Sequence, residues 1–491
     1  MLDILSYVAA FLVLLFITTF IFLWVQDVTQ YRDAIRRNYP VIGRFRGLFI
    51  RLGEFFRQYF FAMDREELPF NRAQREWIYR ATVGRGNTIA FGSTKPLDIP
   101  GTPIFVNAAF PKLEEETHPQ LPLEFGPYCK KPYLSPSFFN ISGMSYGALS
   151  GPAVRALSLG AAQAGIWLNT GEGGLAPHHM EGNADLVFQI GTAKYGVRNA
   201  EGGFDEARLR DLGENDQIKM IEIKLAQGAK PGKGGIVPAG KVTPAIAKIR
   251  GIPVGQASIS PNRHPEIRDP ASLLDAIAFV RGKTGKPVGF KSVFSDYRFI
   301  DALCEEILGR GAIAAPDFIT IDGGDGGTGA SPMPLMDHVG LPLYESLVIV
   351  SNSLRKHGLK DRVRVVASGK LATPANAAYA LALGADRVVS ARGFMFALGC
   401  IQALKCNKNT CPTGITTHNK YLQRGLNPAD KAAKVAAYAQ QVIDQVEIIA
   451  HSCGVEEAAD LQRHHVRIVL PNNTTERADR VFPYPKTLDR A

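Results

Sequence analysis

Cysteine is scarce in this chain, and its spacing is not that of a disulfide framework. Six cysteines occur among 491 residues, without the paired spacings of a small secreted domain. A basic stripe interleaved with aromatic residues is also missing outside the N-terminal segment, which disfavours nucleic-acid binding despite a net charge of +10. About half of that excess lies in residues 26–85, which hold twelve arginines, seven acids and no lysine. With 46% hydrophobic residues, the chain can bury a large core.

Charged residues are absent from residues 4–25, ILSYVAAFLVLLFITTFIFLWV. These 22 positions are enough to cross a hydrocarbon core, which needs ~20 residues. A signal peptide is the alternative, but no basic leading segment or A-x-A-like cleavage site is visible. We therefore predict a retained transmembrane anchor over residues 1–30. Six arginines between positions 32 and 51 follow it, so we expect a single-pass protein of the inner (cytoplasmic) membrane whose remaining residues lie in the cytoplasm.

Residues 31–63 have the apolar spacing of a basic amphipathic juxtamembrane helix. Beyond Pro40, large apolar residues recur at i, i+3, i+4 and i+7. They are Phe45, Leu48, Phe49, Leu52, Phe55, Phe56, Tyr59 and Phe60. Such a helix either lies along lipid headgroups or packs on the catalytic domain, and the sequence leaves both open.

Residues 64–136 are rich in proline and predict an irregular adaptor, after which short apolar runs alternate with helical stretches. That alternation is typical of βα units and a parallel sheet. We predict eight strands, near residues 138–143, 166–169, 186–190, 218–224, 287–293, 317–321, 363–368 and 386–390. An α/β fold with a (β/α)8 barrel over residues 137–425 is favoured over a doubly wound sheet, because no G-x-G-x-x-G follows the first strand. Residues 426–491 predict a C-terminal helix, over 429–453, and a tail.

Three of the six cysteines fall within twelve residues, at Cys400, Cys406 and Cys411. Thiolates are soft ligands that suit iron–sulfur clusters or zinc. Structural zinc usually takes four ligands and a C-x2-4-C pair, which the C-x5-C-x4-C spacing lacks. A cluster held by three thiolates is therefore favoured over zinc and over three ordinary buried thiols. Such an enzyme is more at home in a reducing compartment.

An ordered set of motifs between about residues 137 and 425 resembles the FMN-binding synthase domain of the glutamate synthases. The motifs are ISGMSYGALS (141–150), LNTGEGG (168–174), IEIKLAQGAKPGKGG (221–235), DGGDGGTGASP (322–332), the stretch 391–400 and the cysteine triplet. The resemblance implies a TIM barrel, FMN, and a [3Fe-4S] cluster whose metal ligands are the three cysteines. It also implies an oxidoreductase acting on CH–NH2 donors, here as a membrane-anchored, stand-alone form.

The same resemblance implies FMN contacts at the carboxyl ends of four predicted strands. The residues are Gly143, Met144, Ser145, Asn169, Thr170, Ser368, Gly369, Ala391, Arg392 and Gly393. Loops that open onto helix N-termini bind a phosphate through unpaired N–H groups, and Arg392 would add a charge-assisted bond. One segment departs from the family: ASGKL, at 367–371, stands where a D-G-G-L-like segment is expected. A carboxylate near the ribityl chain is therefore missing.

Lys291, in PVGFKSV, matches the family's lysine that is directed at the flavin, where a cation stabilises the reduced ring. The alternative is an ion pair with Asp322 or Asp325 at the barrel mouth. Other candidates for catalysis or for lining the mouth are Lys224, Gln227, Asp325 and Thr328. Lys230 or Arg263 would supply a cation for an anionic, 2-oxoglutarate-like dicarboxylate.

The amidotransferase nucleophile of the glutamine-dependent relatives is not found, because no cysteine precedes Cys129. We therefore expect ammonia to arrive free or from an amidotransferase partner, and electrons to come from an external donor such as ferredoxin. The leading hypothesis is reductive amination of 2-oxoglutarate to glutamate, that is, glutamate biosynthesis. A related flavoprotein acting on another amine or another keto or imino acid is a second reading. A membrane-tethered redox relay without substrate turnover is a third.

Overall fold

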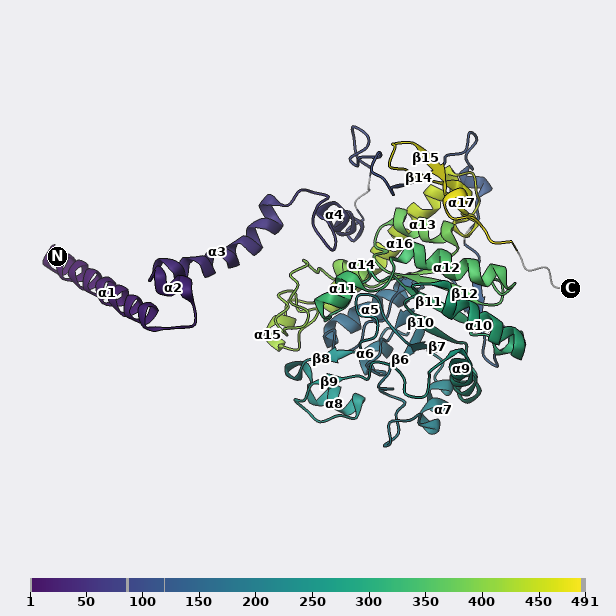
Figure 1. The fold of residues 1–491 in the computed structure, drawn as a ribbon, viewed down its shortest axis with the longest axis horizontal. Helices are drawn as coiled ribbons and strands as arrows, with labels where there is room; N and C mark the ends of the chain where they lie inside the picture. Colours follow the sequence, from purple (N-terminus) through teal and green to yellow (C-terminus); the bar gives the residue numbers. More distant parts are fainter. Residues whose placement is uncertain (1, 85–87, 119, 487–491) are drawn as a thin grey trace. The chain divides into compact units, whose positions relative to one another are not determined.

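The computed structural model describes residues 2–84, 88–118 and 120–486. The chain divides into two compact units, Met1–Arg75 and Glu76–Ala491 (Figure 1). The helix α4 (Arg72–Ala81) crosses the boundary between them.

The first unit is a series of helices joined by tight turns. They are α1 (Leu2–Thr29), α2 (Ala34–Asn38), α3 (Ile42–Phe56) and the π-helical turn η1 (Arg57–Phe61). The segment Asp3–Thr29 is long and apolar enough to cross a membrane, and a signal sequence near an N-terminus meets the same criterion. The sequence predicts one amphipathic helix over residues 31–63, whereas the structure has α2, α3 and η1 there, and no residue of these three is buried.

The second unit is built on a closed barrel of eight parallel strands. The strands are β4 (Phe139–Ile141), β5 (Leu168–Asn169), β6 (Leu186–Ile190), β7 (Ile218–Lys224), β10 (Val288–Ser292), β11 (Phe318–Asp322), β12 (Arg364–Ser368) and β13 (Arg387–Ser390). Pairing of β13 with β4 closes the barrel. The predicted (β/α)8 barrel is confirmed, and each strand begins and ends within two residues of its predicted bounds.

Helices follow the strands and surround the barrel (Figure 1). They are α5 (Gly151–Ala164), α6 (Pro177–Met180), α7 (Glu206–Glu214), α8 (Pro244–Arg250), α9 (Pro270–Thr284), α10 (Tyr297–Arg310), α11 (Met333–His338), α12 (Leu343–Lys356), α13 (Pro374–Leu383), α14 (Arg392–Ala397), α15 (Lys420–Gln423), α16 (Pro428–Ser452) and α17 (Ala478–Val481). The long helix α16 confirms the predicted C-terminal helix. Local sequence sets helix ends: α9 begins at its N-cap Asp269 with Pro270 in its first turn, and it ends at Gly285, whose φ is 71°.

Short strands outside the barrel complete the unit. They are β1 (Pro103–Phe105), β14 (Val466–Val469) and β15 (Thr475–Arg477) in one sheet, β2 (Leu123–Phe125) with β3 (Tyr133–Ser135), and β8 (Ile236–Val237) with β9 (Ser258–Ile259). The sequence predicts an irregular adaptor over residues 64–136, and the structure adds three short strands and α4 within that range.

The hairpin of β2 and β3 packs into the amino-terminal end of the barrel. Its Phe125 and Tyr133 join a buried cluster with Trp167, Val187, Met220, Phe318, Val366 and Val389. The ring of Phe125 lies 5.9 Å from that of Trp167 and 5.8 Å from that of Phe318, edge to face in both cases, an arrangement that aromatic rings prefer. This end of the barrel is therefore filled, and the carboxyl end is left for a site.

Candidate functional site

The carboxyl ends of the strands surround a cavity, called the mouth cavity below. Together with the solvent at its opening it encloses ≈ 1000 Å³. Its lining includes Gly143, Met144, Ser145, Glu172, Gln189, Lys224, Gln227, Lys230, Lys241, Arg250, Thr328, Ala391, Arg392 and Cys406. Active sites of (β/α)8 barrels lie at this end, so the cavity is the candidate site.

Cations outnumber acids in the mouth cavity. Lys224 Nζ lies 3.0 Å from Glu172 Oε2 and also donates to Gln227 Oε1. Burial raises the pKa of Glu172, but the charges of Lys224, Lys230 and Arg250 outweigh it and hold that pKa below its usual value. Burial lowers the pKa of Lys230 to about 8, against the pull of Glu172. One carboxylate thus faces several cations, and the remaining positive charge suits an anionic ligand.

A polar network lies beneath the mouth. The carboxylate of Glu222 on β7 is buried and accepts from Asn169 Nδ2 at 2.9 Å, Gln189 Nε2 at 2.6 Å and Thr320 Oγ1 at 2.5 Å. Gly143 rests on this network, since a Cβ there would meet Asn169 Oδ1 and Gln189 Nε2 at 2.9 Å. A glycine therefore lets the end of β4 close against the barrel floor.

Lys291 is buried beside Asp322 rather than in the lining of the mouth cavity. Its Nζ lies 3.1 Å from Asp322 Oδ2 and 3.5 Å from Ser368 Oγ. Burial lowers the pKa of Lys291, but Asp322, Glu222 and Glu172 outweigh it, so the net shift is upward and the ammonium is held charged. The ion-pair alternative that the sequence leaves open is present in the structure.

The loop after β11 folds across the end of β13. Arg392 Nη2 donates to Thr328 O at 3.0 Å, and a Cβ on Gly327 would meet the Arg392 guanidinium at 2.8 Å. Asp325 Oδ1 accepts from the backbone N–H of Leu343, so it caps the start of α12. Lys370, in the departing ASGKL segment, lies 4.0 Å from Asp325. Asp325 therefore serves the loop and does not line the mouth cavity.

The three cysteines of the C-x5-C-x4-C segment line a second cavity, called the cysteine cavity below, which encloses ≈ 480 Å³ together with the solvent at its opening. Gln402 N–H donates to Cys400 Sγ at 3.4 Å, and Cys411 Sγ lies 3.3 Å from Thr413 Oγ1. Burial raises the pKa of Cys400 to about 11. Burial also raises the pKa of Cys411, but hydrogen bonds from Thr413 and Thr416 outweigh it and lower that pKa overall.

The cysteine loop is shaped by distant residues. Lys241 is buried, and its Nζ donates to Ala148 O at 2.6 Å and to Cys406 O at 3.4 Å. Tyr79 Oη donates to Cys400 O at 2.6 Å. Within the described part of the chain, no three His, Cys, Asp or Glu side chains are grouped closely enough to hold a single metal ion. A three-iron cluster is larger than one ion and holds its thiolates further apart.

The structure brings together some of the residues expected from the sequence and not others. The mouth cavity is lined by Gly143, Met144, Ser145, Lys224, Gln227, Ala391 and Arg392. Those outside its lining are Asn169, Thr170, Lys291, Asp325, Ser368, Gly369 and Gly393. Arg263 also lies outside it, because its guanidinium donates to three carbonyls of its own loop, those of His264, Pro265 and Ile267.

The polar residues of the site that were missed from the sequence include Gln189, Glu222, Lys241 and Arg250. Glu222 could have been predicted from the sequence. It lies in a predicted barrel strand, two residues before Lys224, and a carboxylate that points into a barrel is unusual. No local pattern marks Lys241 or Arg250, whose partners lie in other loops.

The conserved region of glutamate synthase matches residues 123–456. The chain is 39% identical over 489 residues to the glutamate synthase large subunit-like protein YerD of Bacillus subtilis, covering 92% of each protein. It is 33% identical over 355 residues to the archaeal-type glutamate synthase [NADPH] of Thermotoga maritima, covering 72% of this chain and 64% of that protein. The recombinant flavin-binding domain of baker's yeast flavocytochrome b2 is 14% identical, with a TM-score of 0.44 over 79% of this chain and 84% of that one.

The barrel itself is established by the strand pairing described above. The conserved region of glutamate synthase spans the whole barrel, from the hairpin that fills its amino-terminal end to α16. The chain therefore belongs to the glutamate synthase family, as a barrel-bearing, glutamate synthase-like oxidoreductase.

Proposed function

We propose that the chain is an FMN- and iron–sulfur-dependent oxidoreductase that reductively aminates 2-oxoglutarate to glutamate, using ammonia and electrons supplied from outside. The proposal rests on the fact that the mouth cavity and the cysteine cavity share part of their lining. Arg392, Met395, Cys406 and Thr416 line both the mouth cavity and the cysteine cavity. Two redox groups held in these cavities would be neighbours.

The residues present fit the two groups. Glycine and small residues at the ends of β4 and β13 leave room in the mouth cavity, and Arg392, which lines it, would supply a cation to a phosphate. Three thiols converge on the cysteine cavity. FMN would supply two-electron chemistry there, and a [3Fe-4S] cluster would pass it single electrons from a donor such as ferredoxin.

The chain's own cations would hold the substrate. Lys224, Lys230 and Arg250 line the mouth cavity and would bind and orient the carboxylates of a 2-oxo or 2-imino dicarboxylate. Glu172 keeps its negative charge through Lys224 and Lys230, so it would limit how much anionic charge the cavity accepts. The buried Asp322 carboxylate would keep the Lys291 ammonium charged and fixed in place for the reduced form of the cofactor.

Partners and location follow the same proposal. An external electron donor and an ammonia source, free or from an amidotransferase partner, complete the reaction. The apolar helix α1, followed by an arginine-rich and lysine-free segment, would anchor the chain in the cytoplasmic membrane with the barrel on the cytoplasmic side.

The test uses full-length protein purified without oxygen. FMN, iron and sulfide are measured per chain, and the protein is then incubated with reduced ferredoxin, ammonium and 2-oxoglutarate. We expect glutamate that depends on each component. If another keto acid or amine re-oxidises the reduced protein faster, the substrate assignment is wrong. If both groups cycle but no acid in a panel is turned over, the protein is a redox relay. If neither group is bound, the proposal fails.

A further inference from the structure

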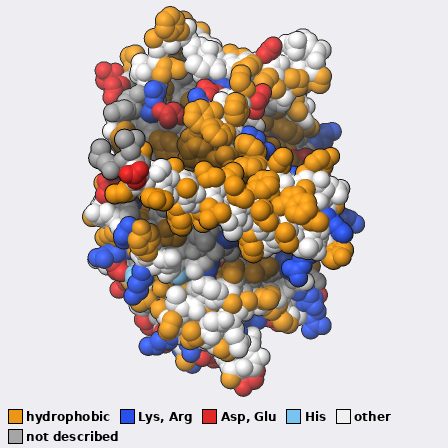
Figure 2. All heavy atoms as spheres, turned by 90° about the vertical axis from the view of Figure 1, so that its left-hand side faces the viewer, with side chains coloured by type: hydrophobic (Ala, Val, Ile, Leu, Met, Phe, Trp, Pro, Cys, Tyr) orange, Lys and Arg blue, Asp and Glu red, His pale blue; other side chains and the backbone are white. Residues whose placement is uncertain are grey.

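The helix α3 exposes a continuous apolar row. At about 100° per residue, Phe45, Leu48, Phe49, Leu52, Phe55 and Phe56 fall on one side of it. Tyr59, Phe60 and Phe61 extend the apolar surface in η1, and all nine side chains are exposed, Phe49 by 66%. Figure 2 shows hydrophobic side chains gathered in a broad patch on the face that it draws. A row of this size on a soluble surface marks a site of contact.

Arginines border this row. Arg44, Arg46 and Arg51 lie toward its two sides on the same helical projection, and Gly47 lies nearly opposite Phe49. Arg46 and Arg51 are exposed. An apolar face flanked by arginines is typical of helices that lie in a membrane surface, because long cationic side chains reach lipid phosphates while the apolar face enters the acyl boundary.

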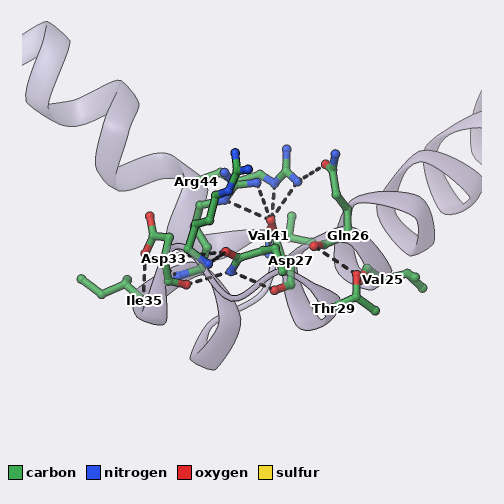
Figure 3. A network of polar contacts seen from close by, with 11 residues as sticks. Val25, Gln26, Asp27, Thr29, Asp33, Ile35, Val41 and Arg44 are labelled. Atoms are coloured by element: carbon green, nitrogen blue, oxygen red, sulfur yellow. Dashed lines mark hydrogen bonds and ion pairs between the residues drawn. The ribbon is translucent and has the colours of Figure 1, made fainter.

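The direction of α3 is fixed at its start by one buried carboxylate. Asp27, near the end of α1, is fully buried and accepts from Arg36 Nη2 at 2.6 Å, Arg44 Nε at 2.7 Å and Val41 N–H at 3.0 Å (Figure 3). Gln30 Nε2 also bridges the carbonyls of Asp27 and Asp33. These contacts join α1, α2 and α3, so the turn between them, called the elbow below, is a built structure and not a loose linker.

The elbow also holds an unfavourable backbone conformation. Val41, which precedes α3, has a φ of 63° and a ψ of −52°, and a β-branched residue rarely adopts a positive φ. The hydrogen bond from its N–H to Asp27 stabilises that conformation. The turn between α2 and α3 therefore depends on the same carboxylate that binds the two arginines.

We propose that α3 and η1 lie in the surface of the membrane that α1 crosses, with the apolar row in the lipid and with Arg46 and Arg51 on anionic lipid phosphates. The inference rests on α1 being a retained span. The bilayer is the occupant because α3 begins thirteen residues after α1 ends, at the point where the chain would leave the bilayer. The surrounding segment, with twelve arginines, seven acids and no lysine, complements an anionic leaflet.

The test compares two tryptophans on opposite sides of α3 in the full chain, in nanodiscs with ~30% anionic lipid. Phe49→Trp lies in the apolar row. Gly47→Trp is the matched control, because nothing lies within 4 Å of a Cβ at Gly47 and the change leaves the charge unaltered. The three native tryptophans are subtracted with the unsubstituted chain. We expect brominated lipids to quench the tryptophan at position 49 at least ~3-fold more than that at position 47.

Two further variants separate the parts of the proposal. Asp27→Asn should reduce the difference between positions 49 and 47, because it removes the charge that holds Arg36 and Arg44. Arg46→Glu with Arg51→Glu should weaken quenching at position 49 in anionic but not in zwitterionic nanodiscs.

Equal quenching at both positions would overturn the proposal. So would a blue-shifted but unquenched tryptophan at position 49, because α3 would then pack on protein, either the barrel or a second copy. Carbonate extraction and the mass of the mature chain report separately whether α1 is retained as a span. None of these measurements depends on the reaction catalysed by the barrel.

Discussion

A single buried ammonium joins the two cavities of the site. Lys241 donates to the carbonyl of Ala148, in the loop after β4, and to that of Cys406, in the cysteine loop. Both loops contribute to the lining of the mouth cavity. The position of the cysteines relative to the mouth therefore depends on a residue that is neither a ligand nor part of any motif in the sequence.

Substitution of Lys241 by methionine should loosen the cysteine loop. The change keeps the length of the side chain but leaves two buried carbonyls without their charged donor, which costs about 1–3 kcal/mol. We expect a lower thermal midpoint and less iron per purified chain. Lys241→Arg retains the charge and should restore part of the thermal midpoint and part of the iron content. A Lys241→Met protein with unchanged iron content and midpoint would show that the loop is held by other contacts.

Lys230 should set the alkaline limit of activity. Burial lowers its pKa to about 8, so the free protein loses this cation as the pH rises through that value. If Lys230 binds a substrate carboxylate, kcat/KM for 2-oxoglutarate should fall above pH ~8, by up to tenfold per pH unit. Lys230→Arg keeps its charge in this range and should move the fall to higher pH. An unchanged profile in that variant would assign the limit to another group.

At the scale of residues, the sequence predicts the site residues that directly follow a barrel strand. It misses those that other, distant segments of the chain bring to the site. Gly143, Met144 and Ser145 follow β4 directly, and the structure brings them to the mouth cavity. Lys291 illustrates the limit: its place on β10 was predictable, but its pairing with Asp322 instead of the open cavity depends on the register between β10 and β11. Arg250 and Lys241 reach the site only because α8 and the turn before it fold across the mouth.

At the scale of elements, helices α5 and α16 pack unusually closely. A Cβ on Gly160 of α5 would lie 2.6 Å from Val435 Cβ and 2.7 Å from Ala432 O, both on α16. Contacts this short with a branched side chain and a backbone carbonyl leave no room to adjust. The glycine is therefore a requirement of packing and not of backbone conformation.

Gly160→Ala should destabilise the barrel by about 1–3 kcal/mol, the usual cost of overpacking. Gly282→Ala is the matched control, because Gly282 lies within α9 and a methyl group there would have nothing within 4 Å of it. At that position the better helix propensity of alanine should stabilise the protein by roughly 0.5–1 kcal/mol. Thermal unfolding of both variants measures the change in stability, which should be a loss for Gly160→Ala and a gain for Gly282→Ala. Equal shifts of the unfolding midpoint in the two variants would contradict the packing argument.

The elements themselves were largely predictable. Each barrel strand is a short apolar run followed by a glycine-rich or polar loop, and this pattern can be recognised in the sequence alone. The hairpin of β2 and β3 was not predictable, because Leu123–Phe125 and Tyr133–Ser135 lie in a proline-rich stretch. Their burial comes from the barrel end that they fill, which local sequence does not encode.

At the scale of the whole molecule, the chain combines a helical N-terminal unit with a barrel that carries two adjoining cavities. The boundary between the units falls inside α4, after Arg75. Sequence patterns distinguish the apolar and basic N-terminal segment from the barrel. They do not locate this boundary, because α4 is continuous through it.

The order of electron flow through the molecule can be tested at the lining that the two cavities share. Cys406 lines both cavities, so its loss should remove the route between an external one-electron donor and the mouth cavity, while the other residues that line the mouth cavity stay in place. We expect Cys406→Ala to purify with little iron but with its FMN, and to lose ferredoxin-linked turnover by at least ~100-fold, as expected when a group needed for every turnover is removed. Direct chemical reduction of its flavin should still occur.

Cys129→Ser is the control, because Cys129 lies in neither cavity and serine keeps a donor toward Asp317. Full ferredoxin-linked activity in Cys406→Ala would mean that electrons reach the mouth without the cysteine cavity, and the proposed redox role of that cavity would then be wrong.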